Sequence, residues 1–209
     1  MTRLVVLSAG LGVPSSTTLL ADRLAAAVVR RLGGGAEGGV EVERVELRRL
    51  AHPLADRLTT GFAGEELAAA LESVRDADAL VAVTPVYAAS YSGLFKTFVD
   101  VLDRDALDGT PVVVAATGGT PRHSMVLDHA LRPLFAHLRA VVAPTGVFAA
   151  TDDFGDAGLD DRVERAAGEL VALLGGPAAT RPRPTVDERL ADPTPFEELL
   201  RRAGAGPTG

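Results

Sequence analysis

The stretch Val81–Leu102, with the sequence VAVTPVYAASYSGLFKTFVDVL, indicates the fold class because a strand, a turn and a helix follow one another within it. It begins inside the apolar run Leu80–Val83, which is typical of a strand buried on both faces. We expect Pro85 to end this strand, since proline has no N–H group to donate to a sheet ladder. From Leu94 onward apolar residues recur with the helical period. The loop Val86–Gly93 therefore lies at the carboxyl end of a buried strand, where open α/β sheets bind ligands.

The composition narrows the classes of function. The chain has 209 residues, of which 47% are hydrophobic, enough for one α/β domain with a core. The net charge of −7 argues against a nucleic-acid-binding protein, because a phosphate backbone attracts a basic surface. The absence of cysteine excludes disulfides, thiolate nucleophiles and iron–sulfur clusters. Redox chemistry would then require a bound organic cofactor.

The hydropathy pattern bears on where the protein works. No apolar run is long enough to cross a bilayer. The first residues lead directly into an expected strand, without the pattern of a signal peptide. We therefore expect a cytoplasmic protein that binds neither a membrane nor a nucleic acid.

Strands and helices alternate five times along the chain, which predicts a parallel sheet with helices on both faces. The expected strands are 4–7, 40–47, 80–83, 111–116 and 140–147. The expected helices are 18–32, 65–75, 94–102, 122–138 and 159–174, while 48–64 is expected to be irregular. Residues 1–176 then form one three-layer α/β/α domain, and residues 177–209 form a tail rich in Pro, Arg and Gly.

The second strand sets the order of the sheet. Val40–Leu47 alternates apolar and charged residues, as an edge strand does. The order 2-1-3-4-5 places it at an edge and puts the switch point between strands one and three. The loops Ser8–Thr18 and Pro85–Gly93 then face one crevice, which Thr117–Pro121 borders.

The first of these loops ends at the start of a helix. There Ser15, Ser16, Thr17 and Thr18 lie where the helix dipole and unpaired N–H groups attract a phosphate. The loop has neither the Walker spacing with its lysine nor the pattern GxGxxG, so it suits a monophosphate such as that of FMN. The alternative is that the hydroxyls only cap the helix.

The other two loops suit a flat ring. Tyr87 and the backbone around it can line an aromatic ring, although the tyrosines of this loop can equally cover the core. Gly118 and Gly119 let backbone amides approach a ligand, and in a flavin site they would stabilise the charge that develops near N1 on reduction. A plain turn is the alternative for these glycines. His123, at the start of the next expected helix, can reach the crevice.

Other chemistries lack their residues. A phosphorylated receiver domain needs an acidic residue where Thr84 ends the third strand, and a serine hydrolase needs a GxSxG motif that is missing. His123, His129 and His137 miss the spacing of a metal site. Pro133 lies inside an expected helix and predicts either a simple proline kink or a one-residue π-bulge around His129.

Three stretches carry a family resemblance: TPVYAASYSGLFKTFVDVL (84–102), ALDGTPVVVAATGGTPRHSMVLDHALRPLF (106–135) and TGVFA (145–149). They resemble the NAD(P)H-dependent FMN reductases of the flavodoxin-like fold. The likeness is strongest to the sulfonate-utilisation reductases, whose motifs are PVY-x-x-S-x-S-G-x-x-K and ATGG. The resemblance spans about Leu4–Leu174.

The resemblance implies a residue set for FMN, with no catalytic side chain and no metal ligand. The FMN phosphate would be held by Ser8, Ser15, Ser16, Thr17 and Thr18. The ribityl chain and ring would pack on Pro85, Val86 and Tyr87. The pyrimidine end would be held by Thr117, Gly118 and Gly119, and His123 is a further candidate at the crevice.

The resemblance also implies the reaction NAD(P)H + FMN → NAD(P)⁺ + FMNH2, with hydride passing from the nicotinamide to flavin N5. The reduced flavin would go to a partner monooxygenase, and the relatives are dimers or tetramers. Arg122 is a candidate for the 2′-phosphate of NADPH. Two alternatives stay open: an FMN-retaining NAD(P)H quinone or azo reductase, and a non-enzymatic flavodoxin-type electron carrier.

Overall fold

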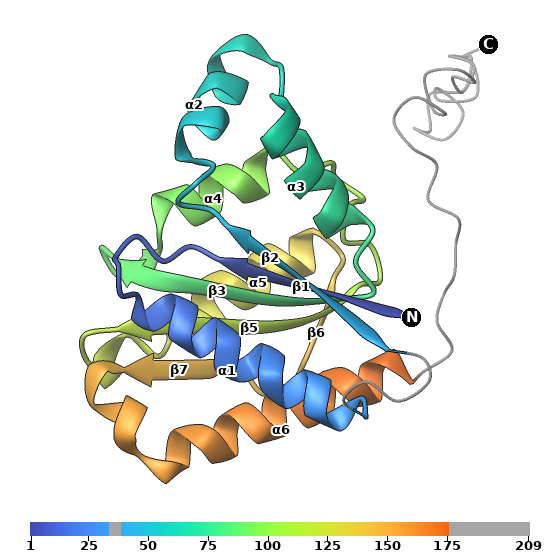
Figure 1. Cartoon of the computed structure of the whole chain (residues 1–209). Coiled ribbons are helices and arrows are strands. Elements are labelled where there is room, and N and C mark those ends of the chain that lie inside the picture. Colours follow the sequence, from blue (N-terminus) through green and yellow to red (C-terminus); the bar gives the residue numbers. More distant parts are fainter. Residues whose placement is uncertain (34–38, 176–209) are drawn as a thin grey trace, which may run out of the picture. The chain divides into compact units, whose positions relative to one another are not determined.

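The computed structural model describes residues 1–33 and 39–175 (Figure 1). The expected tail at 177–209 lies outside the described residues. Within the described part, no helix is both long and apolar enough to cross a membrane.

A parallel sheet forms the middle layer of the domain (Figure 1). Its central strands run side by side in the order β2-β1-β3-β5. Their bounds are β1 (Thr2–Ser8), β2 (Val40–Glu46), β3 (Ala79–Tyr87) and β5 (Pro111–Gly118). The order confirms the predicted 2-1-3-4-5 arrangement, with the alternating strand at the edge.

The fifth strand position is shared by two short strands, not filled by one. β6 (Val141–Val142) pairs with the amino end of β5, and β7 (Val147–Ala150) pairs with its carboxyl end. The expected single strand 140–147 is therefore wrong in its bounds. Pro144 has no N–H for the ladder, and the carbonyls of Ala143 and Pro144 accept hydrogen bonds from Arg132 instead.

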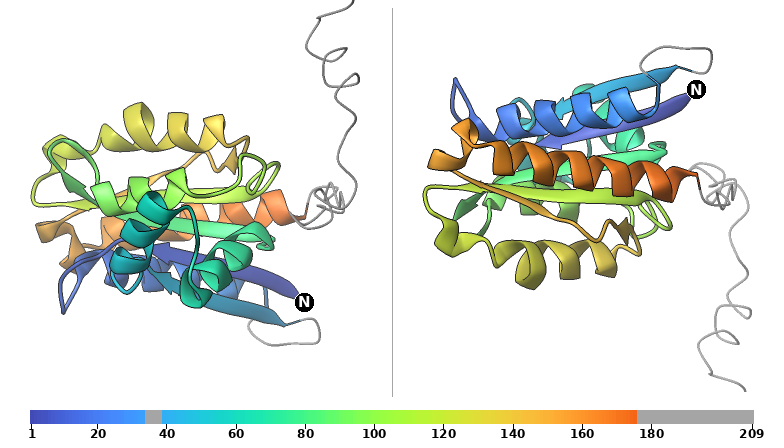
Figure 2. Two further views of the ribbon diagram at one scale, coloured as in Figure 1. Left: turned by 90° about the horizontal axis from the view of Figure 1, so that it is seen from above. Right: turned by 90° about the horizontal axis from the view of Figure 1, so that it is seen from below.

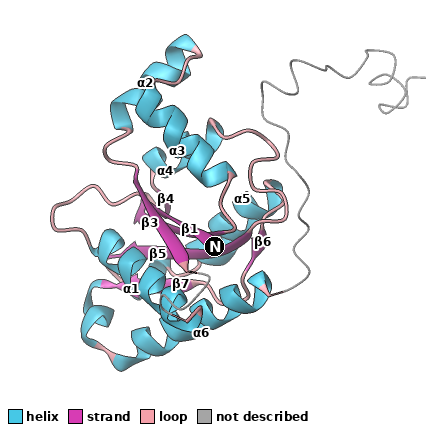
Figure 3. Cartoon of the chain, turned by 45° about the vertical axis from the view of Figure 1, so that its right-hand side comes forward, coloured by secondary structure: helices cyan, strands magenta, loops and turns pink. Residues whose placement is uncertain are grey.

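Helices cover both faces of the sheet, as Figure 2 shows from two opposite sides and Figure 3 from a third direction. One face carries α1 (Ser16–Arg31) and α6 (Ala157–Leu174). The other carries α2 (Ala51–Thr60), α3 (Glu65–Arg75), α4 (Gly93–Asp100) and α5 (Arg132–His137). The segment 48–64, expected to be irregular, contains α2. Within that helix only Leu54 is buried, so the helical period is weak in the sequence.

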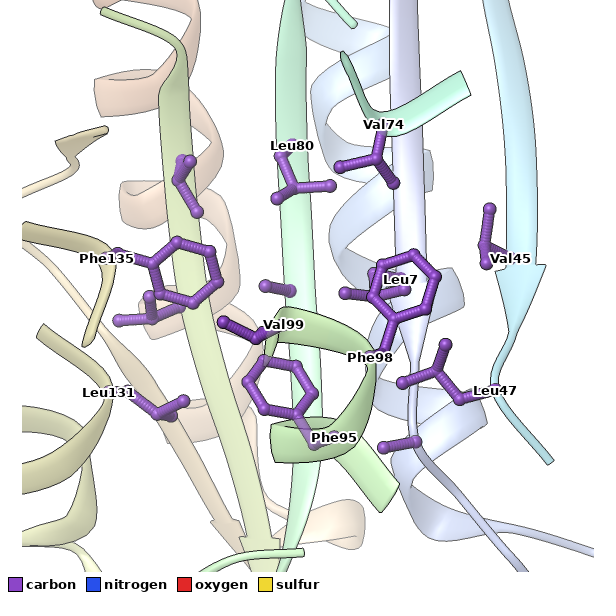
Figure 4. Packing of buried hydrophobic residues seen from close by; sticks show 14 of the residues in the cluster. Leu7, Val45, Leu47, Val74, Leu80, Phe95, Phe98, Val99, Leu131 and Phe135 are labelled. Atoms are coloured by element: carbon purple, nitrogen blue, oxygen red, sulfur yellow. The ribbon is translucent and has the colours of Figure 1, made fainter. Parts of the chain in front are cut away.

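The central strands contribute side chains to both cores. In β3, Leu80 and Ala82 face one cluster and Val81 and Val83 face the other, and all four are fully buried. This confirms the prediction of a strand buried on both sides. Figure 4 shows the larger cluster, where aromatic side chains fill the space under the helices.

The exit of β3 differs from the expectation. Pro85 does not end the strand: it pairs in register with Thr117 of β5, and β3 continues to Tyr87. Beyond Pro85 the chain pairs with β4 (Ser90–Tyr91) in a short antiparallel hairpin. Proline is tolerated because it lies at the last position of the β3–β5 ladder, where its missing donor affects only the end of the ladder.

The helix expected at 122–138 is a succession of three pieces. A 3₁₀ turn covers Pro121–His123, a π-helix covers Leu127–Leu131, and α5 follows. Pro133, in the first turn of α5, has no N–H group for an α-helical bond to His129. Of the two expectations around His129, a kink or a π-bulge, the structure shows the π-helix.

Candidate functional site

Three turns meet at one edge of the sheet. Because β1, β3 and β5 are parallel neighbours, their carboxyl ends point the same way. Ser8 lies beside Val83 in the register, and Pro85 lies beside Thr117. The chain leaves β1 along this edge, where the N–H of Ala9 donates to the Val83 carbonyl at 2.9 Å. The predicted meeting of the three turns is therefore observed.

The first turn ends at the start of α1. Ser15 is the N-cap residue, and its Oγ accepts a hydrogen bond from the Thr18 N–H at 3.2 Å. The N–H groups of Ser16 and Thr17 precede the first intrahelical hydrogen bond, which runs from Leu19 to the Ser15 carbonyl. The first helical turn holds no acidic residue. Two amides and the positive end of the helix dipole are thus available to an anion.

The five hydroxyls of this turn have different partners. Ser15 caps the helix, and Ser8 Oγ shares a 3.3 Å hydrogen bond with Thr18 Oγ1. Thr17 is buried, and its hydroxyl shares a hydrogen bond with a residue of another turn, described below. Ser16 is exposed. Capping and anion binding are therefore compatible here, and the binding of phosphate by these residues stays a prediction.

The first turn depends on a glycine that sequence reasoning missed. A Cβ on Gly10 would lie 2.1 Å from Ser15 Oγ and 3.2 Å from the Cβ of Thr17. Only glycine lets the chain leaving β1 pass so close to the helix start. Its position two residues after the strand is the one sequence signal that could have pointed to it.

The two tyrosines of the second turn play different parts. Tyr87, at the end of β3, is 48% exposed, whereas the Tyr91 ring packs on Phe95 with centroids 6.1 Å apart. One tyrosine can therefore meet a ligand while the other covers the core. The turn between them is formed by Ala88 and Ala89 with φ of 48° and 64°, a left-handed backbone that alanine adopts at a cost.

Two buried hydroxyls hold the second turn in place. Thr84 Oγ1 accepts a hydrogen bond from the Ser92 N–H at 3.0 Å and donates to the Pro85 carbonyl at 3.0 Å. Ser92 Oγ in turn caps α4 by accepting from the Phe95 N–H at 3.2 Å. Sequence reasoning noted only that Thr84 is not acidic, and it missed this role.

The third turn leaves β5 through two glycines. A Cβ on Gly118 would lie 3.0 Å from Phe148 Cζ and 3.8 Å from the Cβ of His123, whereas one on Gly119 would meet nothing within 4 Å. His123 and Arg122 are exposed in the 3₁₀ turn that follows. The Gly-Gly pair is thus more than a plain turn, because Gly118 makes room for Phe148 and Gly119 leaves the backbone open.

The charged side chain of the PVY-x-x-S-x-S-G-x-x-K motif points away from the three turns. Lys96 is part of the motif quoted above, but its ammonium pairs with Asp100 on the exposed side of α4. The hydrogen bond to Asp100 raises the pKa of Lys96. Among residues 1–33 and 39–175, no group of three or more acidic or histidine side chains could hold a metal ion. The polar groups at the three turns are therefore mainly hydroxyls and backbone amides.

The comparisons with known proteins decide the family. The family model described as NADPH-dependent FMN reductase matches residues 2–155. The chain belongs to this family. It is thus an NAD(P)H-dependent FMN oxidoreductase with the flavodoxin-like fold, as the resemblance predicts.

Relatives of this FMN reductase agree. FMN reductase (NADPH) of Pseudomonas aeruginosa is 39% identical over 83% of this chain and 93% of its own length. NADH-dependent FMN reductase SfnE of Pseudomonas putida is 40% identical over 85% of this chain and 95% of its own. A solved oxidoreductase structure from Corynebacterium diphtheriae has a TM-score of 0.79 and 48% identity over 83% of this chain and 97% of that one. Relatives named for NADPH and for NADH are about equally similar to this chain.

The residues at the three turns fit FMN. The start of α1 offers free amides without an acidic neighbour, Tyr87 is half-exposed, and the backbone at Gly119 is open. These features match a phosphate, a flat ring and the polar edge of that ring.

Proposed function

We propose that the chain binds FMN at the three turns, reduces it with NAD(P)H and delivers FMNH2 to a partner monooxygenase. One observation carries the proposal: an acid-free helix start, a half-exposed tyrosine and an open glycine backbone lie at the carboxyl edge of neighbouring strands. Phosphate, ring and pyrimidine ends of one ligand can be bound there together.

The start of α1 would bind the phosphate. The N–H groups of Ser16 and Thr17, with the exposed Ser16 hydroxyl, supply donors to its oxygens. Ser8, Ser15 and Thr18 shape this end of the site through their hydrogen bonds to one another and to the backbone. An anion at a helix N-terminus gains about 1 to 2 kcal/mol in partly buried geometry. The phosphate should therefore raise affinity about fivefold to thirtyfold over riboflavin.

The second and third turns would bind the ring. Val86 and Tyr87 would offer an apolar surface to the ribityl chain and one ring face, whereas Pro85 is buried. The backbone of Thr117, Gly118 and Gly119, at and beyond the end of β5, would hold the pyrimidine edge. His123 lies beside Gly118, from which it could reach this end of the ligand.

FMN, when bound, supplies the acceptor for the hydride of the nicotinamide. The protein would position the two reacting rings and would not act as an acid or a base. The hydroxyls of Ser8, Ser15, Thr17, Thr18 and Thr84 are all engaged in hydrogen bonds within the protein. Holding the reacting rings in contact removes much of the entropic part of the barrier.

Delivery to a monooxygenase is supported by the motifs shared with the sulfonate-utilisation reductases. The similarity to SfnE extends over 85% of this chain. Association into dimers or tetramers, implied by the same resemblance, stays a prediction.

The test is an NADH and NADPH oxidation assay with no flavin and with added FMN, FAD or riboflavin. We expect oxidation to depend on added FMN and to supply an FMNH2-dependent monooxygenase in a coupled assay. A chain that keeps its FMN and reduces a quinone or azo dye without added flavin would be an FMN-retaining quinone or azo reductase. A chain that binds FMN but hardly oxidises either nicotinamide would be an electron carrier. Absence of any flavin-stimulated oxidation contradicts the proposal.

A further inference from the structure

Two threonines connect the first and third turns directly. Thr17 Oγ1 and Thr117 Oγ1 share a 2.8 Å hydrogen bond although the residues are 100 positions apart in the chain. Thr17 lies in the first turn of α1, and Thr117 lies one residue before Gly118. Both are almost entirely buried, at 2% and 4% exposure. The bond thus joins the proposed phosphate end of the site to the proposed pyrimidine end.

The periodicities of the two elements explain why these side chains meet. Val113 and Ala115 of β5 face the core under α1 and α6, and Thr117 continues the same face of the strand. On α1, Thr17 lies on the buried side together with Leu20 and Leu24. The hydroxyl of Thr117 therefore lies on the face of the sheet that α1 covers.

One of the two hydroxyl hydrogens of this pair is not used by the hydrogen bond between them. Two hydroxyl groups carry two hydrogens, and only one of them lies between the two oxygens. Within the described residues neither hydroxyl makes a second hydrogen bond. Buried donors are normally satisfied, so the remaining hydrogen is available to an acceptor atom of a ligand at the three turns.

We propose that Thr17 and Thr117 form a positioning pair that makes the site selective for flavins carrying a phosphate. This inference rests on the proposed function. The pair sets the separation between the start of α1 and the Gly118–Gly119 turn. A ligand that spans both, such as FMN, then binds in one register, whereas riboflavin has no phosphate to occupy the α1 end.

The test is a double-mutant cycle read out by flavin binding. Thr17→Val and Thr117→Val replace each hydroxyl by a methyl group of similar size. Flavin fluorescence measures the dissociation constants of FMN and riboflavin for both variants and the double variant. We expect each single change to weaken FMN binding about tenfold. Riboflavin binding should change by less than about twofold, and the double variant should be no weaker than either single one.

Conservative and matched variants separate positioning from general damage. Thr17→Ser and Thr117→Ser keep the hydroxyls and should keep the preference for FMN. Thr110→Val makes the same change at a buried threonine just before β5, at the end of the strand away from the three turns, and should leave the FMN-to-riboflavin ratio unchanged. If a valine variant does not fold, the alanine variant removes the hydroxyl without placing a methyl group against its partner.

The outcomes distinguish this inference from the proposed function. Equal weakening of FMN and riboflavin, or additive effects in the double variant, would overturn the positioning pair. If the wild-type chain binds FMN and oxidises NAD(P)H with it, but the valine variants keep the FMN-to-riboflavin ratio, only the positioning role of the threonine pair is overturned. A wild-type chain that binds no flavin overturns both.

Discussion

Gly118 and Phe148 are packed so closely that a Cβ on the glycine would lie 3.0 Å from Cζ of the phenylalanine. Phe148, on β7, is itself buried at 7% exposure. The turn that we assign to the pyrimidine end of FMN is therefore shaped by a core side chain of the neighbouring strand, and not by the Gly-Gly sequence alone.

Gly118→Ala should disturb both packing and flavin use. The added methyl group forces the Phe148 ring to move, which costs about 1 to 3 kcal/mol. We expect a lower melting temperature and a KM for FMN raised about tenfold in steady-state assays. Gly119→Ala is the matched control because its Cβ would meet nothing within 4 Å, so its stability should change by less than about 0.5 kcal/mol. Equal destabilisation by both substitutions would show that the contact with Phe148 does not matter.

Gly10→Ala should disrupt the start of α1. The new Cβ would clash with Ser15 Oγ, and moving that hydroxyl breaks its hydrogen bond to the Thr18 N–H. Loss of an N-cap costs about 1 kcal/mol, and chemical denaturation measures it. In a Ser15→Ala background, Gly10→Ala should cost less, because the clashing oxygen is gone. Gly39→Ala, in open space away from the site, is the control. An unchanged cost in the Ser15→Ala background would argue against the contact.

The turn after β3 should become more stable with residues suited to its backbone. Ala88 and Ala89 both have positive φ in a two-residue hairpin turn, where Asn-Gly is the preferred pair. A left-handed backbone costs an alanine about 1 to 2 kcal/mol. Replacing the alanine by glycine removes this cost, but the gain is partly offset because glycine makes the unfolded chain more flexible. Ala88→Asn with Ala89→Gly should therefore raise the free energy of unfolding by about 1 kcal/mol in urea titrations. A lower free energy of unfolding would mean that the alanines make contacts beyond the turn.

Glu164 should contribute a small stability that depends on pH and salt. Its carboxylate on α6 bonds to Arg30 and Arg31 of α1, and the hydrogen bond from Arg30 is the main cause of its lowered pKa. A lowered folded pKa means that ionised Glu164 stabilises the fold above the unfolded value of about 4.3. That contribution is lost as the pH falls through the folded pKa.

Because this carboxylate is exposed, Glu164→Gln should cost no more than about 0.5 kcal/mol at pH 7 and low salt. The cost should disappear at about 1 M salt, and also at a pH below the folded pKa. Thermal unfolding at two salt concentrations and two pH values measures it. A cost that is independent of salt would assign the effect to packing between the helices.

Local patterns along the chain were enough to predict a large part of the fold. Apolar runs located the buried strands, the alternation of Val40–Leu47 located the edge, and together they set the strand order and the edge where the three turns meet. Pro133 indicated a disturbed helix around His129, either kinked or bulged, and the structure decided for a π-helix. The motif around Tyr87 and the ATGG stretch were enough to predict the family that the comparisons show.

Which polar groups could meet a ligand became visible only in the folded chain. It showed that Thr17 is bonded to Thr117, that Lys96 is paired away from the site, and that Gly10 and Gly118 are confined by Ser15 and Phe148. It also showed that β3 continues past Pro85 and that α2 forms although only one of its residues, a leucine, is buried. Periodicity in the sequence reports how one segment buries its own apolar face. A hydrogen bond or a steric contact between residues 100 positions apart arises only when the packed sheet brings them together, and no local pattern encodes it.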